Sequence, residues 1–308
     1  MPGKGISVQP LMSSIQEETF QTRIVMGALK DLGYDVKPIK EVEYATAVVA
    51  IGNGDGTFMA DYWNPLHADF YKNGGGDAKL FRKGEYIANN LQGYLIDKKT
   101  VDANKITNLS QLKDPKIATL VDADGDSKAD LAGCVPGWGC EKVIEHQLTD
   151  FKLRDSVTHK QGAYAALIAD VIARYKAGKP VLYDTWTPYW VSSVLVPGKD
   201  VVWLEVPHSS QPGANQGKST KLPDGMDYGF EVNVQQIVAN KAFTDANPAA
   251  AKVFELAKLS VNDVNAQNTR MNEGEKDSAA IDRHVAASIK ANQKTYDDWL
   301  AAARAAKK

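Results

Sequence analysis

Residues 180–190, Pro-Val-Leu-Tyr-Asp-Thr-Trp-Thr-Pro-Tyr-Trp, read as a short apolar strand that runs directly into a Trp-x-Pro corner. A second corner of this kind occurs at Trp63-Asn64-Pro65, again after a strand-like segment. The tryptophans at the two corners are 123 positions apart (186 − 63), which is about one domain length. This internal repeat predicts two lobes, each of which presents a tryptophan from a strand-to-loop corner toward a cleft between them.

Strands and helices alternate along the rest of the chain. Short strands are expected near residues 6–9, 34–36, 92–96, 201–206 and 230–238. Ser14 and Glu17 have the spacing of a capping box, which predicts the start of a helix. The apolar stripe of this helix consists of Phe20, Ile24, Ala28 and Leu32. A second helix is expected over residues 158–177, and helices follow from Pro248 onward. The pattern is that of an α/β fold with mixed sheets and helical cover.

The bulk composition is that of an ordinary globular protein. The chain has 308 residues, 44% hydrophobic and 24% charged, which is comfortable for two domains. A formal net charge of −2 with mixed signs argues against a nucleic-acid surface. No apolar run has the length that spans a bilayer, and residues 1–10 lack the apolar core of a signal peptide. We therefore expect either a cytoplasmic protein or the mature form of an exported one.

Two cysteines, Cys134 and Cys140, lie in the short segment Cys-Val-Pro-Gly-Trp-Gly-Cys. The only two cysteines of the chain are six positions apart on a loop with Pro and Gly, which favours a small disulfide ring in an oxidising compartment. A pair of reduced thiols in a cytosolic loop is the plainer alternative. A redox-active pair is a third, although the C-x-x-C spacing is missing.

Three of the six tryptophans lie on loops rich in Pro and Gly, namely Trp63, Trp138 and Trp186. A single tryptophan usually packs in a core, and this is what we expect for Trp190, Trp203 and Trp299. Three indoles on stiff loops instead indicate an aromatic cage. Such a cage suits a quaternary ammonium group, which donates no hydrogen bond and is held by the faces of the rings. Each face contributes roughly 0.5–2 kcal/mol, so a second anchor is needed for tight binding.

The second anchor is expected to hold a carboxylate. His67 follows Trp63 by four positions and either projects into the same cleft or is a structural histidine bonded to a neighbouring carbonyl. The backbone N–H groups of Gly139 and Cys140 follow Trp138 on a Gly-rich loop and are candidates for an anion-binding nest. The site predicted from the residues is thus a cage for one end of a zwitterion.

Several longer motifs carry a resemblance that runs in order through nearly the whole chain. They are Pro2-Gly3-Lys4-Gly5-Ile6, Glu17-Glu18-Thr19-Phe20-Gln21-Thr22, Trp63-Asn64-Pro65-Leu66-His67, Gln92-Gly93-Tyr94-Leu95-Ile96-Asp97-Lys98-Lys99, Gly137-Trp138-Gly139-Cys140-Glu141 and Thr185-Trp186-Thr187-Pro188-Tyr189-Trp190-Val191. With these motifs the chain resembles the periplasmic glycine betaine/proline betaine-binding proteins of osmoprotectant ABC importers. Asn64 is a departure from the residue usual in the family, but the indole and the turn are kept.

The resemblance implies roles for particular residues. Trp63, Trp138 and Trp186 would form the cage, His67 with the amides of Gly139 and Cys140 would hold the carboxylate, and Cys134 and Cys140 would form a disulfide. It also implies a hinged, two-lobed fold of the type II periplasmic-binding class, with a first lobe of residues 1–100 and 230–308 and a second of residues 101–229. A monomer in the periplasm that serves a membrane permease, without a cofactor, is the expected context.

Asp122, Asp124, Asp126 and Asp130 have the spacing of the first ligands in a calcium loop. Gly125 and Gly133 do not match the glycine and glutamate positions of an EF-hand, so an acidic surface turn is the plainer interpretation. A structural calcium ion remains a minor expectation at these four aspartates.

Two rivals to a betaine site remain open. Choline or dimethylsulfoniopropionate would satisfy the same cage, and choline would not use the carboxylate anchor. The other rival is an enzyme on the same scaffold. The sequence nominates no catalytic pair for it, and no G-x-S-x-G, phosphate-loop or zinc signature occurs.

Overall fold

The computed structural model describes residues 1–306, and the chain divides into two compact units. Unit 1 consists of Met1–Asn90 and Asn233–Lys308, and unit 2 consists of Leu91–Val232. The sequence-based division placed residues 91–100 and 230–232 in the first lobe, whereas the structure has them in unit 2. In the structure the strand Gln92–Asp97 pairs with two strands of unit 2, and it therefore belongs to that unit.

Unit 1 is built on a four-stranded antiparallel sheet of β5 (Phe58–Asn64), β13 (Asn233–Asn240), β6 (Leu80–Arg82) and β7 (Ile87–Asn90). The long strand β13 pairs with all three of the others, so the returning chain completes this sheet. Two small parallel pairs accompany it, β1 (Ser7–Val8) with β3 (Asp35–Val36) and β2 (Leu11–Met12) with β4 (Lys40–Glu41).

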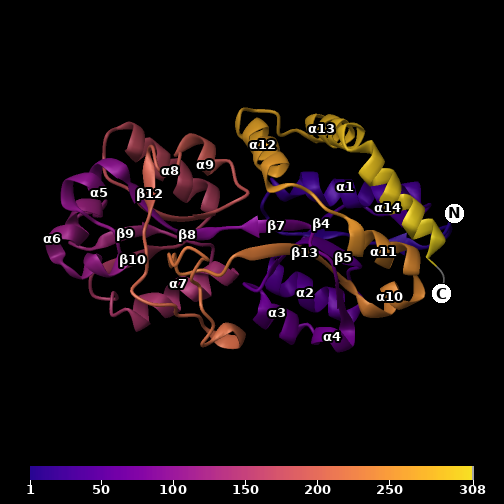
Figure 1. Ribbon diagram of the computed structural model, residues 1–308, viewed down its shortest axis with the longest axis horizontal. Helices are drawn as coiled ribbons and strands as arrows, with labels where there is room; N and C mark the ends of the chain where they lie inside the picture. Colours follow the sequence, from indigo (N-terminus) through magenta and orange to yellow (C-terminus); the bar gives the residue numbers. More distant parts are fainter. Residues whose placement is uncertain (307–308) are drawn as a thin grey trace. The chain divides into compact units, whose positions relative to one another are not determined.

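Helices cover the sheet of unit 1, and α14 packs on α11 while α13 packs on α1 (Figure 1). The helices are α1 (Glu18–Asp31), α2 (Tyr44–Asn53), α3 (Ala68–Asn73), α4 (Gly76–Lys79), α10 (Lys241–Ala246), α11 (Pro248–Leu256), α12 (Val261–Asn272), α13 (Ser278–Ala291) and α14 (Gln293–Ala305). The predicted stripe of α1 is confirmed, because Phe20, Ile24, Ala28 and Leu32 are all buried in the core of this unit. Trp299 lies in the same core, as expected for a packing residue.

Unit 2 contains a mixed five-stranded sheet in the order β10 (Val157–Lys160), β9 (Ala129–Ala132), β11 (Leu182–Trp186), β8 (Gln92–Asp97) and β12 (Val201–Trp203). Its first three strands are parallel to one another, and β8 is antiparallel to both of its neighbours. The helices of this unit are α5 (Lys98–Asn104), α6 (Pro115–Ala118), α7 (Gly139–Asp150), α8 (Tyr164–Lys176) and α9 (Val191–Val194), with short 3-10 turns at Leu109–Lys113, Thr119–Val121 and Gly213–Asn215.

Two expectations for local structure are wrong. The helix expected over 158–177 begins only at Tyr164, because Val157–Lys160 pairs with β9 as the edge strand β10. The capping box of Ser14 and Glu17 does not form either: α1 begins at Glu18, and no side chain caps it. Ser13, the residue before Ser14, instead donates a hydrogen bond to the side chain of Glu18.

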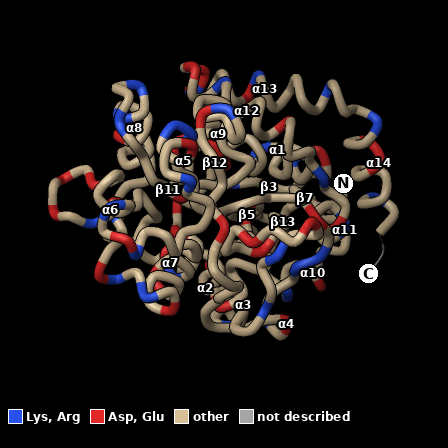
Figure 2. The backbone as a smooth tube through the Cα atoms, turned by 60° about the vertical axis from the view of Figure 1, so that its left-hand side comes forward, with Lys and Arg blue, Asp and Glu red and all other residues tan. Residues whose placement is uncertain are grey.

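Acidic and basic residues are interspersed over the elements of each unit (Figure 2), as the mixed charge pattern predicts. None of the helices in residues 1–306 combines the length and apolar character needed to cross a bilayer.

Candidate ligand-binding site

Trp63 and His67 form a closed turn at the end of β5 in unit 1. The backbone N–H of His67 donates to the carbonyl of Trp63 at 2.8 Å, and the backbone N–H of Trp63 donates to Nδ1 of His67 at 3.2 Å. Since Nδ1 accepts a hydrogen bond, the neutral ring carries its proton on Nε2. His67 is therefore not simply donating to a neighbouring carbonyl from Nδ1, and its Nε2–H is a donor suited to a carboxylate.

The imidazole of His67 is packed among aromatic rings of unit 1. Its centroid lies 4.6 Å from that of Tyr44, 5.0 Å from Phe70 and 5.6 Å from Tyr62. Only 2% of His67 is exposed. Packing on these sides restricts the tilt of the ring and hence the direction of its Nε2–H bond.

Asn64, the departure noted in the first Trp-x-Pro corner, has a defined role in the structure. Its Oδ1 accepts a hydrogen bond of 2.8 Å from Arg82, which also donates to the hydroxyl of Tyr62 at 3.1 Å. The guanidinium lies over the ring of Tyr71, 4.1 Å from its centroid. Burial raises the pKa of Tyr62 to about 12, while the charge of Arg82 opposes the shift. The side chain of Asn64 thus ties the corner to β6.

Trp138 and Trp186 meet in unit 2. Their ring centroids are 5.9 Å apart and the ring planes cross at 71°. The ring of Tyr164 lies 4.5 Å from Trp186, and that of Tyr189 lies 4.8 Å from it on centroid distances. Two crossed indoles with flanking phenols make two walls of an aromatic box.

Sequence reasoning missed the two tyrosines of this cluster as site residues. Tyr164 lies within the helix expected over residues 158–177, where helical spacing alone does not separate a core residue from a site residue. Its hydroxyl donates to the carbonyl of Asp184 at 2.8 Å, which fixes the ring beside Trp186. Tyr189 follows Trp186 by three positions, and this proximity was the available signal.

The disulfide between Cys134 and Cys140 is present, as the sequence predicts, and it closes the loop that carries Trp138. Trp138 is the N-cap residue of α7, so Gly139 and Cys140 are the first two residues of that helix. The first N–H groups of a helix have no acceptor within it, and the helix dipole favours an anion there. The backbone amides expected to hold a carboxylate thus belong to a helix N-terminus.

A pair formed by the buried imidazole of His159 and the partly exposed carboxylate of Glu145 supports this loop, and sequence reasoning missed it. His159 Nδ1 lies 2.7 Å from a carboxylate oxygen of Glu145, and His159 Nε2 accepts the backbone N–H of Cys134 at 3.1 Å. Burial lowers the pKa of His159, which favours the neutral ring that this acceptor role requires. A Cβ at Gly133 would lie 1.9 Å from His159 Nε2, so only glycine fits there.

Each Trp-x-Pro corner is preceded by a buried aspartate, two positions before the tryptophan. Asp61 on β5 and Asp184 on β11 are both 0% exposed. The peptide bonds Asn64–Pro65 and Thr187–Pro188 are both cis. The internal repeat seen in the sequence therefore extends to Asp-x-Trp-x-Pro and to the backbone of the corner. Burial raises the pKa of Asp184 well above its ordinary value.

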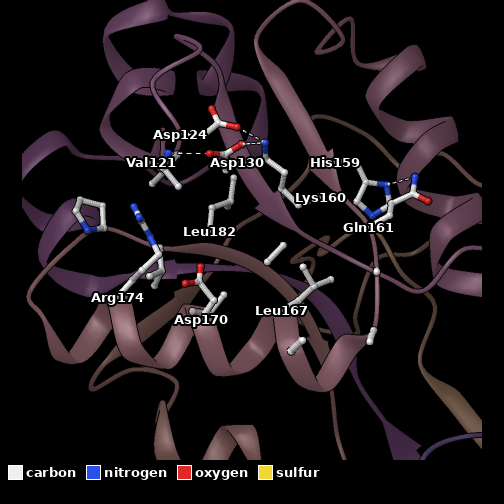
Figure 3. Close-up of a pocket in the computed structure, with 18 residues that line it drawn as sticks. Val121, Asp124, Asp130, His159, Lys160, Gln161, Leu167, Asp170, Arg174 and Leu182 are labelled. Carbon is white, nitrogen blue, oxygen red and sulfur yellow. Dashed lines mark hydrogen bonds and ion pairs between the residues drawn. The ribbon is translucent and has the colours of Figure 1, made fainter.

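The four aspartates of the possible calcium loop lie in unit 2. Oxygens of Asp122, Asp124 and Asp130 come within 4.8 Å of one another. The ammonium of Lys160 lies between two of them, 2.5 Å from Asp124 and 3.0 Å from Asp130 (Figure 3). These contacts raise the pKa of Lys160.

The remaining carboxylate oxygens of this loop bind its own backbone. Asp122 accepts N–H groups of Gly125 and Ser127 at 2.7 and 2.9 Å, and Asp126 accepts that of Lys128 at 2.8 Å. Calcium prefers six to eight oxygen ligands. A lysine that neutralises the cluster and a backbone that occupies its oxygens fit an acidic turn better than a calcium site, so calcium binding stays a prediction that the geometry disfavours.

The fold is shared with solved substrate-binding proteins. A choline-binding protein of an ABC transporter, in complex with choline, superposes with a TM-score of 0.74 at 18% sequence identity, covering 96% of this chain and 92% of that one. Two compact α/β units and this likeness show the fold of the type II periplasmic-binding class.

The sequence comparisons narrow this class. The family model for the substrate-binding domain of ABC-type glycine betaine transport systems matches residues 7–288. The glycine betaine-binding periplasmic protein OusX of Dickeya dadantii is 58% identical over all of this chain and 93% of its own length. The glycine betaine/proline betaine-binding periplasmic protein of Escherichia coli is 55% identical with the same coverage. The chain belongs to this family, whose members are binding proteins of transport systems and not enzymes.

Proposed function

We propose that this protein captures glycine betaine or proline betaine outside the cytoplasmic membrane and delivers it to the permease of an ABC importer. The observation that carries the proposal is the pair of crossed indoles, Trp138 and Trp186, next to the N-terminus of α7. A betaine has both a quaternary ammonium group, which the indoles can bind, and a carboxylate, which the helix N-terminus can bind. Family membership and the names of the relatives support the same ligand class.

In the proposed complex, the ammonium group lies against Trp63, Trp138 and Trp186. Three indole faces at roughly 0.5–2 kcal/mol each give a few kcal/mol. The carboxylate accepts hydrogen bonds from Nε2–H of His67 and from the backbone N–H groups of Gly139 and Cys140. Because hydrogen bonds to a charged acceptor are the stronger ones, this end fixes the orientation of the ligand.

The proposed mechanism is closure of the two units on the ligand. Trp63 and His67 belong to unit 1, and Trp138 and Trp186 belong to unit 2. A ligand that needs residues of both units binds the closed state better than the open one and so shifts the population toward closure. The closed form is then the one that docks on the permease. We further propose that the protein acts as a monomer in the periplasm.

The alternative ligands share the cation but differ at the other end. Choline is the ligand of one solved structure with this fold and glycine betaine that of another, and dimethylsulfoniopropionate carries a sulfonium with a carboxylate. The N–H groups proposed to bind a carboxylate favour a betaine over choline as the ligand.

A thermal-shift panel tests this function. Glycine betaine, proline betaine, dimethylsulfoniopropionate, choline and unmethylated glycine are added at equal concentrations. Ligand that binds only the folded state raises Tm with its concentration. We expect the largest rise with the two betaines and none with glycine. A panel in which no betaine raises Tm, or in which glycine matches them, contradicts the proposal.

A further inference from the structure

A cluster of polar side chains is buried in unit 1 next to His67. None of its members is among the proposed ligand contacts. We call it the Glu18 cluster, and it consists of Ser13, Glu18, Tyr44 and Asp61. Glu18 and Asp61 are 5% and 0% exposed. A carboxyl oxygen of Glu18 lies 2.5 Å from the hydroxyl of Ser13, and the other accepts the hydroxyl of Tyr44 at 2.6 Å. The backbone N–H of Ser13 donates to the carboxyl group of Asp61 at 3.4 Å, so Ser13 contacts both acidic side chains.

Burying two carboxyl groups in one cluster lowers the stability of the folded state. Among residues 1–306, no Lys, Arg or His side chain forms an ion pair with Glu18 or Asp61. Burial, followed by the charge of Asp61, raises the pKa of Glu18 well above its ordinary value. Like charges in one buried site do not both ionise, so the pair keeps a proton that we place on Glu18. A core of apolar residues would avoid this cost, which points to a role beyond packing.

The cluster contacts the site through one residue. The ring of Tyr44 packs on the imidazole of His67, with centroids 4.6 Å apart and planes at 45°. The hydroxyl of the same tyrosine is held by Glu18. At the edge of the imidazole, Nδ1 accepts a hydrogen bond from the backbone N–H of Trp63. The rotation of the His67 ring is thus limited on one edge by a hydrogen bond and on one face by a tyrosine that Glu18 anchors.

We propose that Glu18 and Tyr44 are positioning residues, which set the orientation of the His67 ring so that its Nε2–H meets the carboxylate end of the ligand. This inference rests on the proposed betaine site. Neither residue touches the ligand in the proposed complex. Their effect on affinity passes through His67, and this dependence separates a positioning role from a general contribution to folding.

The test is a double-mutant cycle on glycine betaine affinity, measured by titration calorimetry. Tyr44→Phe removes the hydroxyl and keeps the ring. A lost hydrogen bond that orients a donor corresponds to about a fivefold weaker Kd. We expect this loss in the wild-type background and no further loss when Tyr44→Phe is combined with His67→Ala. Glu18→Leu, which removes the acceptor for the Tyr44 hydroxyl, should give the same pattern in place of Tyr44→Phe.

Tyr296→Phe is the matched control. Tyr296 is also a buried tyrosine of unit 1 whose hydroxyl donates to a carboxylate, that of Asp31 at 2.8 Å, but it packs against Trp299 in the core. This variant should bind glycine betaine as the wild type does. Equal losses from Tyr44→Phe with and without His67, or no loss at all, overturn the inference. Failure of the wild type to bind glycine betaine overturns the proposed function instead.

A spectroscopic measurement keeps the test decisive if His67→Ala binds too weakly to titrate. The imidazole nitrogen shifts of His67, assigned by their loss in His67→Gln, should report a proton on Nε2 in the wild type with ligand. Tyr44→Phe and Glu18→Leu should move these shifts, whereas Tyr296→Phe should not. Unchanged His67 shifts in both cluster variants contradict the positioning role.

Discussion

His67 shows how one backbone contact assigns a chemical role to a side chain. Because its Nδ1 accepts the N–H of Trp63, the proton of the neutral ring is on Nε2. His67→Ala should therefore lower the affinity for glycine betaine by about tenfold, which is the equivalent of one charge-assisted hydrogen bond. Choline has no carboxylate, so the affinity for choline should fall less than twofold in the same variant. Competition titrations with both ligands check this, and equal losses would show that His67 supports the cage and not the carboxylate.

Asp184 makes a prediction about stability and pH. Its carboxyl is buried, with one oxygen accepting from Gln92 at 3.1 Å, and burial raises its pKa well above the ordinary 3.8. The folded protein therefore holds a proton that the unfolded chain releases. Its contribution to stability is fully present below the unfolded pKa and is lost as pH rises through the folded pKa.

Asp184→Asn removes this titration and keeps the acceptor for Gln92. Between about pH 4 and the folded pKa, the free energy of unfolding of the wild type should fall relative to the variant by up to about 1.4 kcal/mol per pH unit. Urea denaturation at several pH values measures the difference. Parallel curves for the two proteins would mean that Asp184 is ionised in the folded state.

At the scale of elements, the start of α7 concentrates the features of the unit 2 site. The loop before the helix is closed by the disulfide, its first residue is tied to His159, and the N-cap residue is Trp138. Gly133 allows His159 to approach, since a Cβ there would lie 1.9 Å from Nε2.

Gly133→Ala should displace His159 and destabilise the protein by about 1–3 kcal/mol, the usual cost of overpacking. Denaturant unfolding measures the loss. In Gly133→Ala/His159→Ala the clash is absent, so the double variant should be more stable than the sum of the two single losses predicts. Strict additivity would show that Gly133 and His159 do not compete for the same space.

The elements also show where sequence reasoning works and where it stops. The stripe of α1, the corners at Trp63 and Trp186, and the disulfide follow from local spacing, and these predictions are confirmed. The strand β10 was mistaken for the start of α8, because its identity depends on pairing with β9 and not on its own period. Ser13 and Glu18 turn inward to a cluster whose other members are far along the chain, which no capping pattern reveals.

The residues of the candidate site also differ in how far the sequence alone could indicate them. The three tryptophans could be proposed from the sequence because the neighbouring glycine and proline residues are local signals. Tyr164 and the Glu145–His159 pair were missed because only the folded unit 2 brings them beside the tryptophans and the disulfide loop. Supporting contacts of this kind join residues that are distant in sequence, so a single sequence carries little trace of them.

For the molecule as a whole, the proposed mechanism requires the two units to close around the ligand. Small-angle scattering should show a smaller radius of gyration with saturating glycine betaine than without it. Trp186→Ala should show little change at the same ligand concentration, because the unit 2 part of the cage is incomplete. An unchanged radius in the wild type at saturation would mean that binding does not need closure.

The central claim is that tryptophans from both units bind one quaternary ammonium group. Titration calorimetry of glycine betaine with the wild type, Trp63→Ala, Trp186→Ala and Trp203→Ala tests it most directly. Trp203 is the matched control, since it is a half-buried tryptophan of unit 2 that packs on Tyr228 with centroids 5.8 Å apart. One indole face is worth roughly 0.5–2 kcal/mol, so each cage variant should lose about two- to thirtyfold in affinity, and Trp203→Ala should bind as the wild type does. Wild-type affinity in either Trp63→Ala or Trp186→Ala would contradict the account.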